Sequence, residues 1–186
     1  MEPDLEPGSF GVELLRRIGR RLLRIPAQIS WVPALAWAAL IWWLSSQEVI
    51  DPPPLIPALP VLGNLVHAVE FGMLALWAVL VLPRRNGWPV IDRATIPRCL
   101  VPMFAYALVD EWHQSAVPHR NASLLDVLTD AVGIVSVLWV IAYLGQGRAD
   151  GPGLGRRLAI GMTGCLCAAW LATAYGNAYG RGPWPW

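Results

Sequence analysis

The sequence predicts an all-α integral membrane bundle of about five transmembrane helices, preceded by a basic amphipathic helix. Hydrophobic residues make up 55% of the 186 positions and charged residues 15%, against about 25% charged in soluble globular proteins. Five mostly apolar stretches are each long enough for a helix to cross the roughly 30 Å hydrocarbon core of a bilayer. Arginine supplies all 14 basic residues and gathers in alternate segments between these stretches.

The predicted spans cover residues 27–46, 61–82, 97–114, 124–144 and 158–176. The third has the weakest signal because it contains two prolines and ends in Asp110 and Glu111. The loop 51–60 is not expected to be helical, since its prolines lack the amide donor and clash with the preceding turn. The expected parts of the chain are a cytoplasmic basic segment (1–26), a transmembrane domain (27–176) and a short outer tail (177–186).

The arginines also predict the orientation. Successive segments outside the spans carry 5, 0, 4, 1, 3 and 1 arginines. Because cytoplasmic segments are enriched in basic residues, we expect a cytoplasmic N-terminus and an external C-terminus. Between Phe10 and Ile25, apolar residues at helical spacing lie mostly opposite the arginines Arg16 to Arg24. This segment is expected to lie on the inner leaflet against anionic lipid, or else to act only as a topology signal.

Composition and cysteine usage exclude several classes of function. The net charge of +1 gives no bulk field to attract nucleic acid, so no nucleic-acid partner is expected. Cys99, Cys165 and Cys167 form no metal-binding pattern. One histidine among carboxylates at no diagnostic spacing is too unspecific to predict a metal, so we expect no metal and no cofactor.

Polar residues lie near the expected outer end of several spans. His67 and Glu70 share a helix face at i, i+3, and Asp126 and Asp130 share one at i, i+4. A helical rise of 1.5 Å per residue puts the polar residues of the second, third and fourth spans at one depth, roughly 10 Å below the outer surface. We expect one polar pocket there, open to the outer leaflet. Its predicted residues are Ser46, His67, Glu70, Asp110, Glu111, Gln114, Arg120, Ser123, Asp126 and Asp130.

The charges of this predicted pocket do not balance. Five carboxylates share one fixed cation, Arg120, which implies protonated carboxyls, a histidinium at position 67, a bound cation or a cationic ligand. The Ser123-x-x-Asp126 pair also has the pattern of a helix capping box. His113 and His119 are expected in a surface loop.

Three motifs follow one another in fixed order: His67-x-x-Glu70-Phe71, Tyr106-Ala-Leu-x-Asp110-Glu111-x-x-Gln114, and Arg120-x-x-Ser123-x-x-Asp126-Val127-Leu128 with Gly133. With these motifs the chain resembles the VanZ-like family of bacterial membrane proteins. The resemblance covers about residues 40–144, so the basic segment and the fifth span lie outside or at its edge. It departs from the family pattern at His119, where glycine is common, and at Asp130, where asparagine is more typical. It implies a bacterial cytoplasmic membrane and an association with resistance to the glycopeptide teicoplanin.

Three functions fit the predicted pocket. The leading hypothesis is recognition of an amphipathic envelope lipid, a lipid-linked wall precursor or a lipoglycopeptide, with Arg120 holding an anionic head group through its bidentate fork. The second is an intramembrane enzyme acting on a lipid phosphate or ester. There His67 and Glu70 would form the acid–base pair, and Asp110 or Glu111 would be a second acid. The third is proton-coupled lipid transport.

The predicted orientation can be tested by labelling single cysteines from outside the cell. On a background without the three native cysteines, a cysteine placed at position 57 or 119 should react with an impermeant maleimide. A cysteine placed at position 87 or 152 should not react until the membrane is opened, because the arginine-rich segments are expected in the cytoplasm. The reverse labelling pattern would invert the topology.

Overall fold

The computed structural model describes residues 9–48, 59–118, 120 and 122–179, and it confirms the predicted all-α membrane bundle. The described part has six α-helices, two short 3-10 helices and one two-stranded hairpin. In chain order these are α1 Ser9–Leu22, η1 Ala27–Ile29, α2 Val32–Ser45, α3 Leu59–Ala78, η2 Val79–Val81, β1 Arg84–Arg85, β2 Trp88–Pro89, α4 Ile96–Gln114, α5 Leu124–Leu144 and α6 Gly151–Tyr179.

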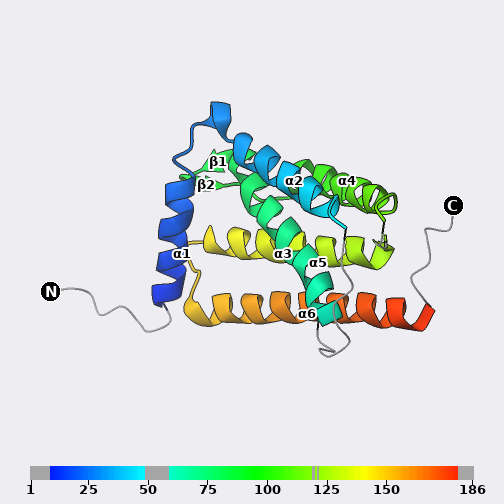
Figure 1. Ribbon diagram of the computed structural model, residues 1–186. Coiled ribbons are helices and arrows are strands. Elements are labelled where there is room, and N and C mark those ends of the chain that lie inside the picture. Colours follow the sequence, from blue (N-terminus) through cyan, green and yellow to red (C-terminus); the bar gives the residue numbers. More distant parts are fainter. Residues whose placement is uncertain (1–8, 49–58, 119, 121, 180–186) are drawn as a thin grey trace.

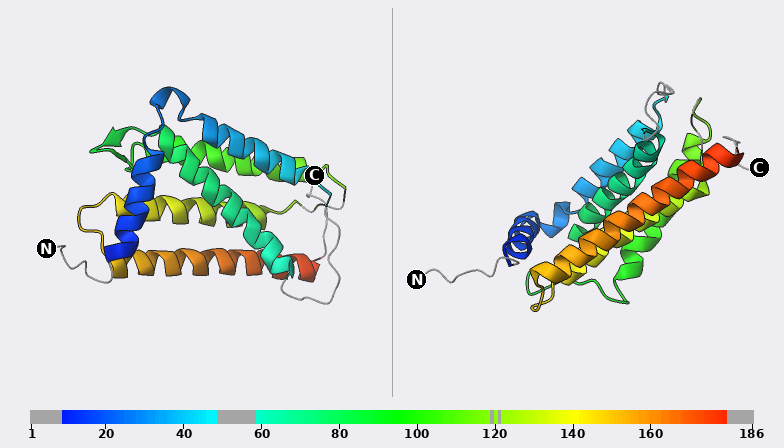
Figure 2. Two further views of the ribbon diagram at one scale, coloured as in Figure 1. Left: turned by 60° about the vertical axis from the view of Figure 1, so that its left-hand side comes forward. Right: turned by 90° about the horizontal axis from the view of Figure 1, so that it is seen from below.

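Helices α2 to α6 run back and forth along the bundle, and α1 lies across one of its ends (Figures 1 and 2). The most extensive contacts join α3 to α5 and α5 to α6, while α2 packs on α3, and α4 packs on both α5 and α3. The chain therefore passes along the bundle five times. The arginine-rich segments before α2, between α3 and α4, and between α5 and α6 all lie at the end that α1 crosses, which we call the basic end.

Four helical segments are long and apolar enough to cross a membrane: Ala27–Ser45, Pro60–Val81, Leu124–Leu144 and Gly151–Gly176. Helix α4 has 19 residues and coincides with the predicted third span, but its charged residues keep it out of this group. It remains helical through Pro102. The last helix begins seven residues earlier than the predicted 158. Proline is tolerated at Pro152 because the first turn of a helix has no intrahelical amide bonds to lose.

The start of α6 is fixed by Asp150. Its carboxylate accepts hydrogen bonds from the backbone amide of Gly153 (2.6 Å) and from the hydroxyl of Tyr143 (3.0 Å). These two donors hold the pKa of Asp150 below its usual range. The tight turn between α5 and α6 therefore keeps the two helices antiparallel and in contact.

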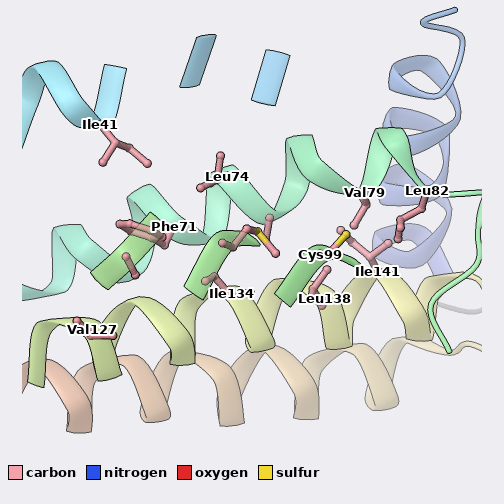
Figure 3. Close-up of a cluster of buried hydrophobic side chains, with 13 residues drawn as sticks. Ile41, Phe71, Leu74, Val79, Leu82, Cys99, Val127, Ile134, Leu138 and Ile141 are labelled. Carbon is pink, nitrogen blue, oxygen red and sulfur yellow. The ribbon is translucent and has the colours of Figure 1, made fainter. Parts of the chain in front are cut away.

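The main hydrophobic core lies between α3, α4 and α5, with Ile41 contributed by α2 (Figure 3). Phe71 and Ile134 are at most 1% exposed at its centre. Large apolar side chains also cover the outside of the bundle, for example Trp112 (66% exposed) and Trp170 (63%). Such a surface is stable against lipid tails, where apolar groups need no further cover.

Helix α1 docks on the basic end by one face. Val12, only 2% exposed, packs with Tyr143, Leu144 and Leu154. The guanidinium of Arg16 donates from Nε to the backbone oxygen of Leu144 (2.9 Å). Arg16 is thus bound within the protein, whereas several apolar residues of α1 stay exposed. They are Phe10, Leu14 and Ile18.

A β-hairpin that the sequence analysis did not predict follows η2. Arg84 pairs with Pro89 and Arg85 with Trp88, around a two-residue turn. Asn86 and Gly87 both have positive φ (53° and 74°), as the tight hairpin turn favoured by Asn-Gly requires. The indole of Trp88 donates to the backbone oxygen of Ile141 (2.9 Å), so the hairpin is held against the end of α5.

Helices α3 and α5 approach so closely that a side chain between them has no room. A Cβ built on Gly133 would overlap the carbonyl oxygen of Ala68 and lie 2.8 Å from its Cα. On the facing helix, a Cβ on Gly72 would meet Val137 at 3.2 Å. Small residues permit this kind of backbone approach between membrane helices.

Replacing Gly133 by alanine is expected to destabilise the bundle by about 1–3 kcal/mol, because the new methyl group meets backbone that cannot move aside. Gly63→Ala on α3 is the matched control, since nothing lies within 4 Å of its Cβ position. Gly63→Ala should be neutral or slightly stabilising. Tryptophan fluorescence during thermal unfolding in detergent gives the unfolding midpoints of both variants. Equal midpoints for the two variants would show that the contact tolerates a side chain.

Candidate functional site

All ten residues predicted for the site lie at the end of the bundle opposite α1, which we call the acidic end. It is formed by the end of α2, the middle of α3, the end of α4, the segment between α4 and α5, and the first half of α5. Six of the ten are buried, and Ser46, Glu70, Arg120 and Ser123 are partly exposed. The buried six are His67, Asp110, Glu111, Gln114, Asp126 and Asp130.

One group of these residues joins α2 to α4. The Oδ2 atom of Asp110 accepts hydrogen bonds from Ser45 Oγ (2.9 Å) and from Gln114 Nε2 (2.8 Å). Ser45 is 3% exposed and was not among the predicted residues. The predicted neighbour, Ser46, instead donates to the backbone oxygen of Trp42 (2.7 Å). Consecutive helix positions point about 100° apart, so the two serines face different parts of α4, and only Ser45 meets Asp110.

The prediction that His113 lies in a surface loop is wrong. His113 belongs to the last turn of α4, where its ring stacks on Trp42 with the centroids 3.9 Å apart. Its Nε2 atom is 2.9 Å from Ser46 Oγ. His113 therefore helps to fasten α4 to α2. His119 lies outside the described residues.

Arg120 is held by the end of α2. Its Nε donates to the backbone oxygen of Gln47 (3.0 Å) and its Nη2 to that of Leu44 (2.7 Å). A longer contact of 3.5 Å joins Nη1 to Gln114 Oε1. Three of the five N–H groups of the guanidinium are thus used within the protein, and two are left for other partners. Arg120 caps helix carbonyls whether or not it also meets a ligand.

A second group brings together one residue from each of three helices. His67 on α3 has its Nδ1 atom 3.3 Å from Asp130 Oδ1 on α5 and 3.9 Å from Glu111 Oε1 on α4. The i, i+3 spacing predicts that His67 pairs with Glu70, one turn along α3. Among the described residues, the acids within ion-pair distance of His67 are Asp130 and Glu111, and Glu70 is not one of them. Glu70 is partly exposed.

The predicted capping box is replaced by a contact between helices. Ser123 does cap α5, because its hydroxyl accepts from the amide of Leu125 (3.1 Å). The amide of Ser123, however, donates to Glu111 Oε2 (2.8 Å) rather than to Asp126. In a capping box, the side chain of Asp126 would accept the hydrogen bond from the Ser123 amide. Glu111 accepts this bond instead, and it thereby joins α4 to the start of α5.

Several buried oxygen atoms at the acidic end have no hydrogen-bond partner in the described part of the chain. They belong to Asp110 (Oδ1), Glu111 (Oε1), Asp126 (Oδ1) and Asp130 (both oxygens). The side chains of Asp110, Glu111 and Asp130 are at most 1% exposed, so the predicted pocket is a closed polar cluster in this conformation. Buried polar atoms without partners are costly, and they mark sites where a proton, ion or ligand is bound.

The described residues also line two cavities near the basic end. One of about 590 Å³ is almost wholly apolar and lies between α1, α3, α5, α6 and Trp88. The other, of about 470 Å³, lies at the turn between α5 and α6 and is lined by polar residues, including Arg148, Arg156 and Arg157. Neither includes a residue of the acidic cluster.

The fold and the cluster together define a multi-pass α-helical membrane protein with buried acids at one end. The family model VanZ/LLP1 matches residues 13–145, which is more than half of the chain, and the protein belongs to this family. The match begins earlier than the residue-40 limit of the resemblance, so it includes α2 and most of α1, whereas α6 lies outside it. No curated protein and no solved structure was found to be similar to this chain.

Exchanging Arg120 for lysine is expected to destabilise the protein nearly as much as exchanging it for alanine, by about 1–2 kcal/mol. A lysine ammonium has no planar fork and cannot reach both carbonyls of α2 in the same geometry. Arg148→Lys is the control, because Arg148 is exposed and makes only a 3.5 Å contact with Gln146. The thermal unfolding midpoints of the three variants measure the loss of stability. A lysine variant as stable as the wild type would show that charge alone suffices at position 120.

Proposed function

We propose that this VanZ-family protein binds the polar head of an amphipathic envelope molecule, such as a lipid-linked wall precursor or a lipoglycopeptide, at its acidic end. The observation that carries the proposal is the pair of buried oxygens, Oδ1 of Asp110 and Oδ1 of Asp126, that have no partner among the described residues. Carboxylates accept hydrogen bonds, so they suit hydroxyl and ammonium groups. A sugar or amine head group has both.

The same proposal assigns the acidic end to the outer leaflet. Twelve of the 14 arginines belong to segments at the opposite, basic end, and arginine-rich segments favour the cytoplasm. The N-terminus is then cytoplasmic and the C-terminus external, in a bacterial cytoplasmic membrane. Exposed apolar side chains on α1, with arginines beside them, fit contact with anionic lipid of the inner leaflet.

The negative charge of the acidic end disfavours a role for Arg120 in holding an anionic head group. The acidic end holds five carboxyl groups beside Arg120 and His67, so an anionic head group would meet repulsion from those that are ionised. Arg120 also has three of its N–H groups engaged. The part of the head group that enters the cluster is therefore expected to be neutral or cationic, with Arg120 and the partly exposed Glu70 at the edge of the site.

Native mass spectrometry of the purified full-length protein tests this proposal. Wild type should retain one class of envelope lipid well above its share of the membrane. Asp126→Asn should retain about tenfold less, the equivalent of one lost charge-assisted hydrogen bond. Glu13→Gln is the control, since Glu13 is an exposed acid at the basic end. A wild-type lipid profile equal to that of the bulk membrane would contradict the proposal.

Lipid extracts from cells with and without the protein distinguish the two other candidate functions. A new head-group product would favour an intramembrane enzyme, for which the His67–Asp130 pair offers acid–base chemistry. A changed distribution between leaflets with no new product would favour transport. Unchanged lipids together with altered teicoplanin susceptibility are the result expected for binding.

A further inference from the structure

The strongest unexplained feature of the molecule is the contact among His67, Glu111 and Asp130. One ligand atom from each lies within 4.8 Å of the other two, and all three residues are buried. They come from α3, α4 and α5, the three helices that form the core. None of the functions considered above requires all three of these atoms to lie close together.

The atoms that face one another lack hydrogen-bond partners. Nδ1 of His67, Oε1 of Glu111 and both carboxylate oxygens of Asp130 are buried without one in the described part of the chain. The contact between His67 and Asp130 at 3.3 Å is an ion pair only when the imidazole is protonated. Even then, one imidazolium does not compensate a second buried carboxylate, so Glu111 has to be protonated or meet another cation.

The geometry points to a metal site: we propose that His67 Nδ1, Glu111 Oε1 and a carboxylate oxygen of Asp130 bind a divalent transition-metal cation such as Zn²⁺. Ligand atoms bound about 2.0–2.1 Å from a tetrahedral zinc lie roughly 3.4 Å from each other. The observed separations of 3.3 Å and 3.9 Å lie close to this value. Small side-chain movements would therefore complete the coordination.

The donor set selects the class of cation. A nitrogen with two carboxylate oxygens suits first-row transition metals, whereas Ca²⁺ and Mg²⁺ prefer oxygen ligands alone. A dication also neutralises both carboxylates, which one proton on His67 does not. Three protein ligands leave a coordination position open, as in sites where zinc binds water or another molecule.

The side chain of Glu111 is already oriented to bind a metal ion. Its second oxygen, Oε2, accepts from the backbone amide of Ser123 at 2.8 Å, which directs Oε1 toward His67. Such outer contacts orient metal ligands and are part of a metal site. The close approach of α3 and α5 at Gly133, three residues after Asp130, limits movement of the other two ligands.

Metal analysis of the full-length protein tests the proposal. The chelator-stripped protein is dialysed against Zn²⁺ and measured by elemental mass spectrometry, and Co²⁺ is used as a spectroscopic probe. We expect one equivalent of Zn²⁺ in the wild type and visible Co²⁺ bands of a mixed nitrogen–oxygen site. His67→Gln and Asp130→Asn should each weaken binding by about 100-fold or more. Zinc should also raise the unfolding temperature of the wild type but not of these variants.

Asp126→Asn is the matched control, since it removes a buried carboxylate one turn before Asp130 that is outside the three-residue group. It should keep the zinc stoichiometry and the Co²⁺ bands. Equal losses for Asp126→Asn and Asp130→Asn would show a diffuse negative field instead of ligation and overturn the proposal. So would a wild type without stoichiometric zinc, which decides the matter even if a ligand variant fails to fold.

The two proposals fail separately. The metal site does not rest on recognition of an envelope lipid, because Asp126→Asn is expected to lose lipid and keep zinc, whereas His67→Gln and Asp130→Asn are expected to lose zinc. A protein that holds zinc but no selected lipid would keep the metal site and lose the proposed function. The opposite result would keep only the binding function.

Discussion

The backbone contact between α3 and α5 determines the geometry of the acidic end. Gly133 meets the backbone of Ala68, which directly follows His67, and Asp130 lies one turn before Gly133. Because no side chain separates the helices there, His67 and Asp130 come within 3.3 Å of each other. A wider spacing would leave a polar side chain from each helix in an apolar interior. Small residues at this crossing are thus a requirement of the site as well as of the packing.

The two neighbouring acids of α4 also connect it to other helices. Asp110 binds Ser45 of α2, and Glu111 binds the first residues of α5 through the amide of Ser123. Consecutive residues of α4 therefore face different neighbours. A buried carboxylate is costly alone, but it stabilises a unique arrangement where each oxygen has a partner. The oxygens that remain without partners are confined to this end of the described bundle, which is why both proposals concern it.

The sequence predicted the elements better than their contacts. Hydropathy and length gave the bounds of α5 as the structure has them, and spacing put Asp126 and Asp130 on one buried face. Spacing along one helix could not show that His67 meets Asp130 on another helix instead of Glu70 on its own, because that depends on how α3 and α5 approach. It also could not decide between Ser45 and Ser46, which differ by one step of helix rotation. The hairpin did have a local signal, Asn86-Gly87, among residues otherwise typical of a loop.

Arginines at both ends of the bundle donate hydrogen bonds to backbone carbonyls at the C-terminal ends of helices. Arg16 donates to the last residue of α5, Arg84 to Leu23 just beyond α1, and Arg120 to carbonyls at the end of α2. Carbonyls at the C-terminal end of a helix lack the usual i+4 amide partner and carry the negative end of the helix dipole. A guanidinium can donate to two of them at once, whereas an ammonium is a single point charge. These three arginines therefore stabilise the ends of helices, in addition to the effect that positive charge has on topology.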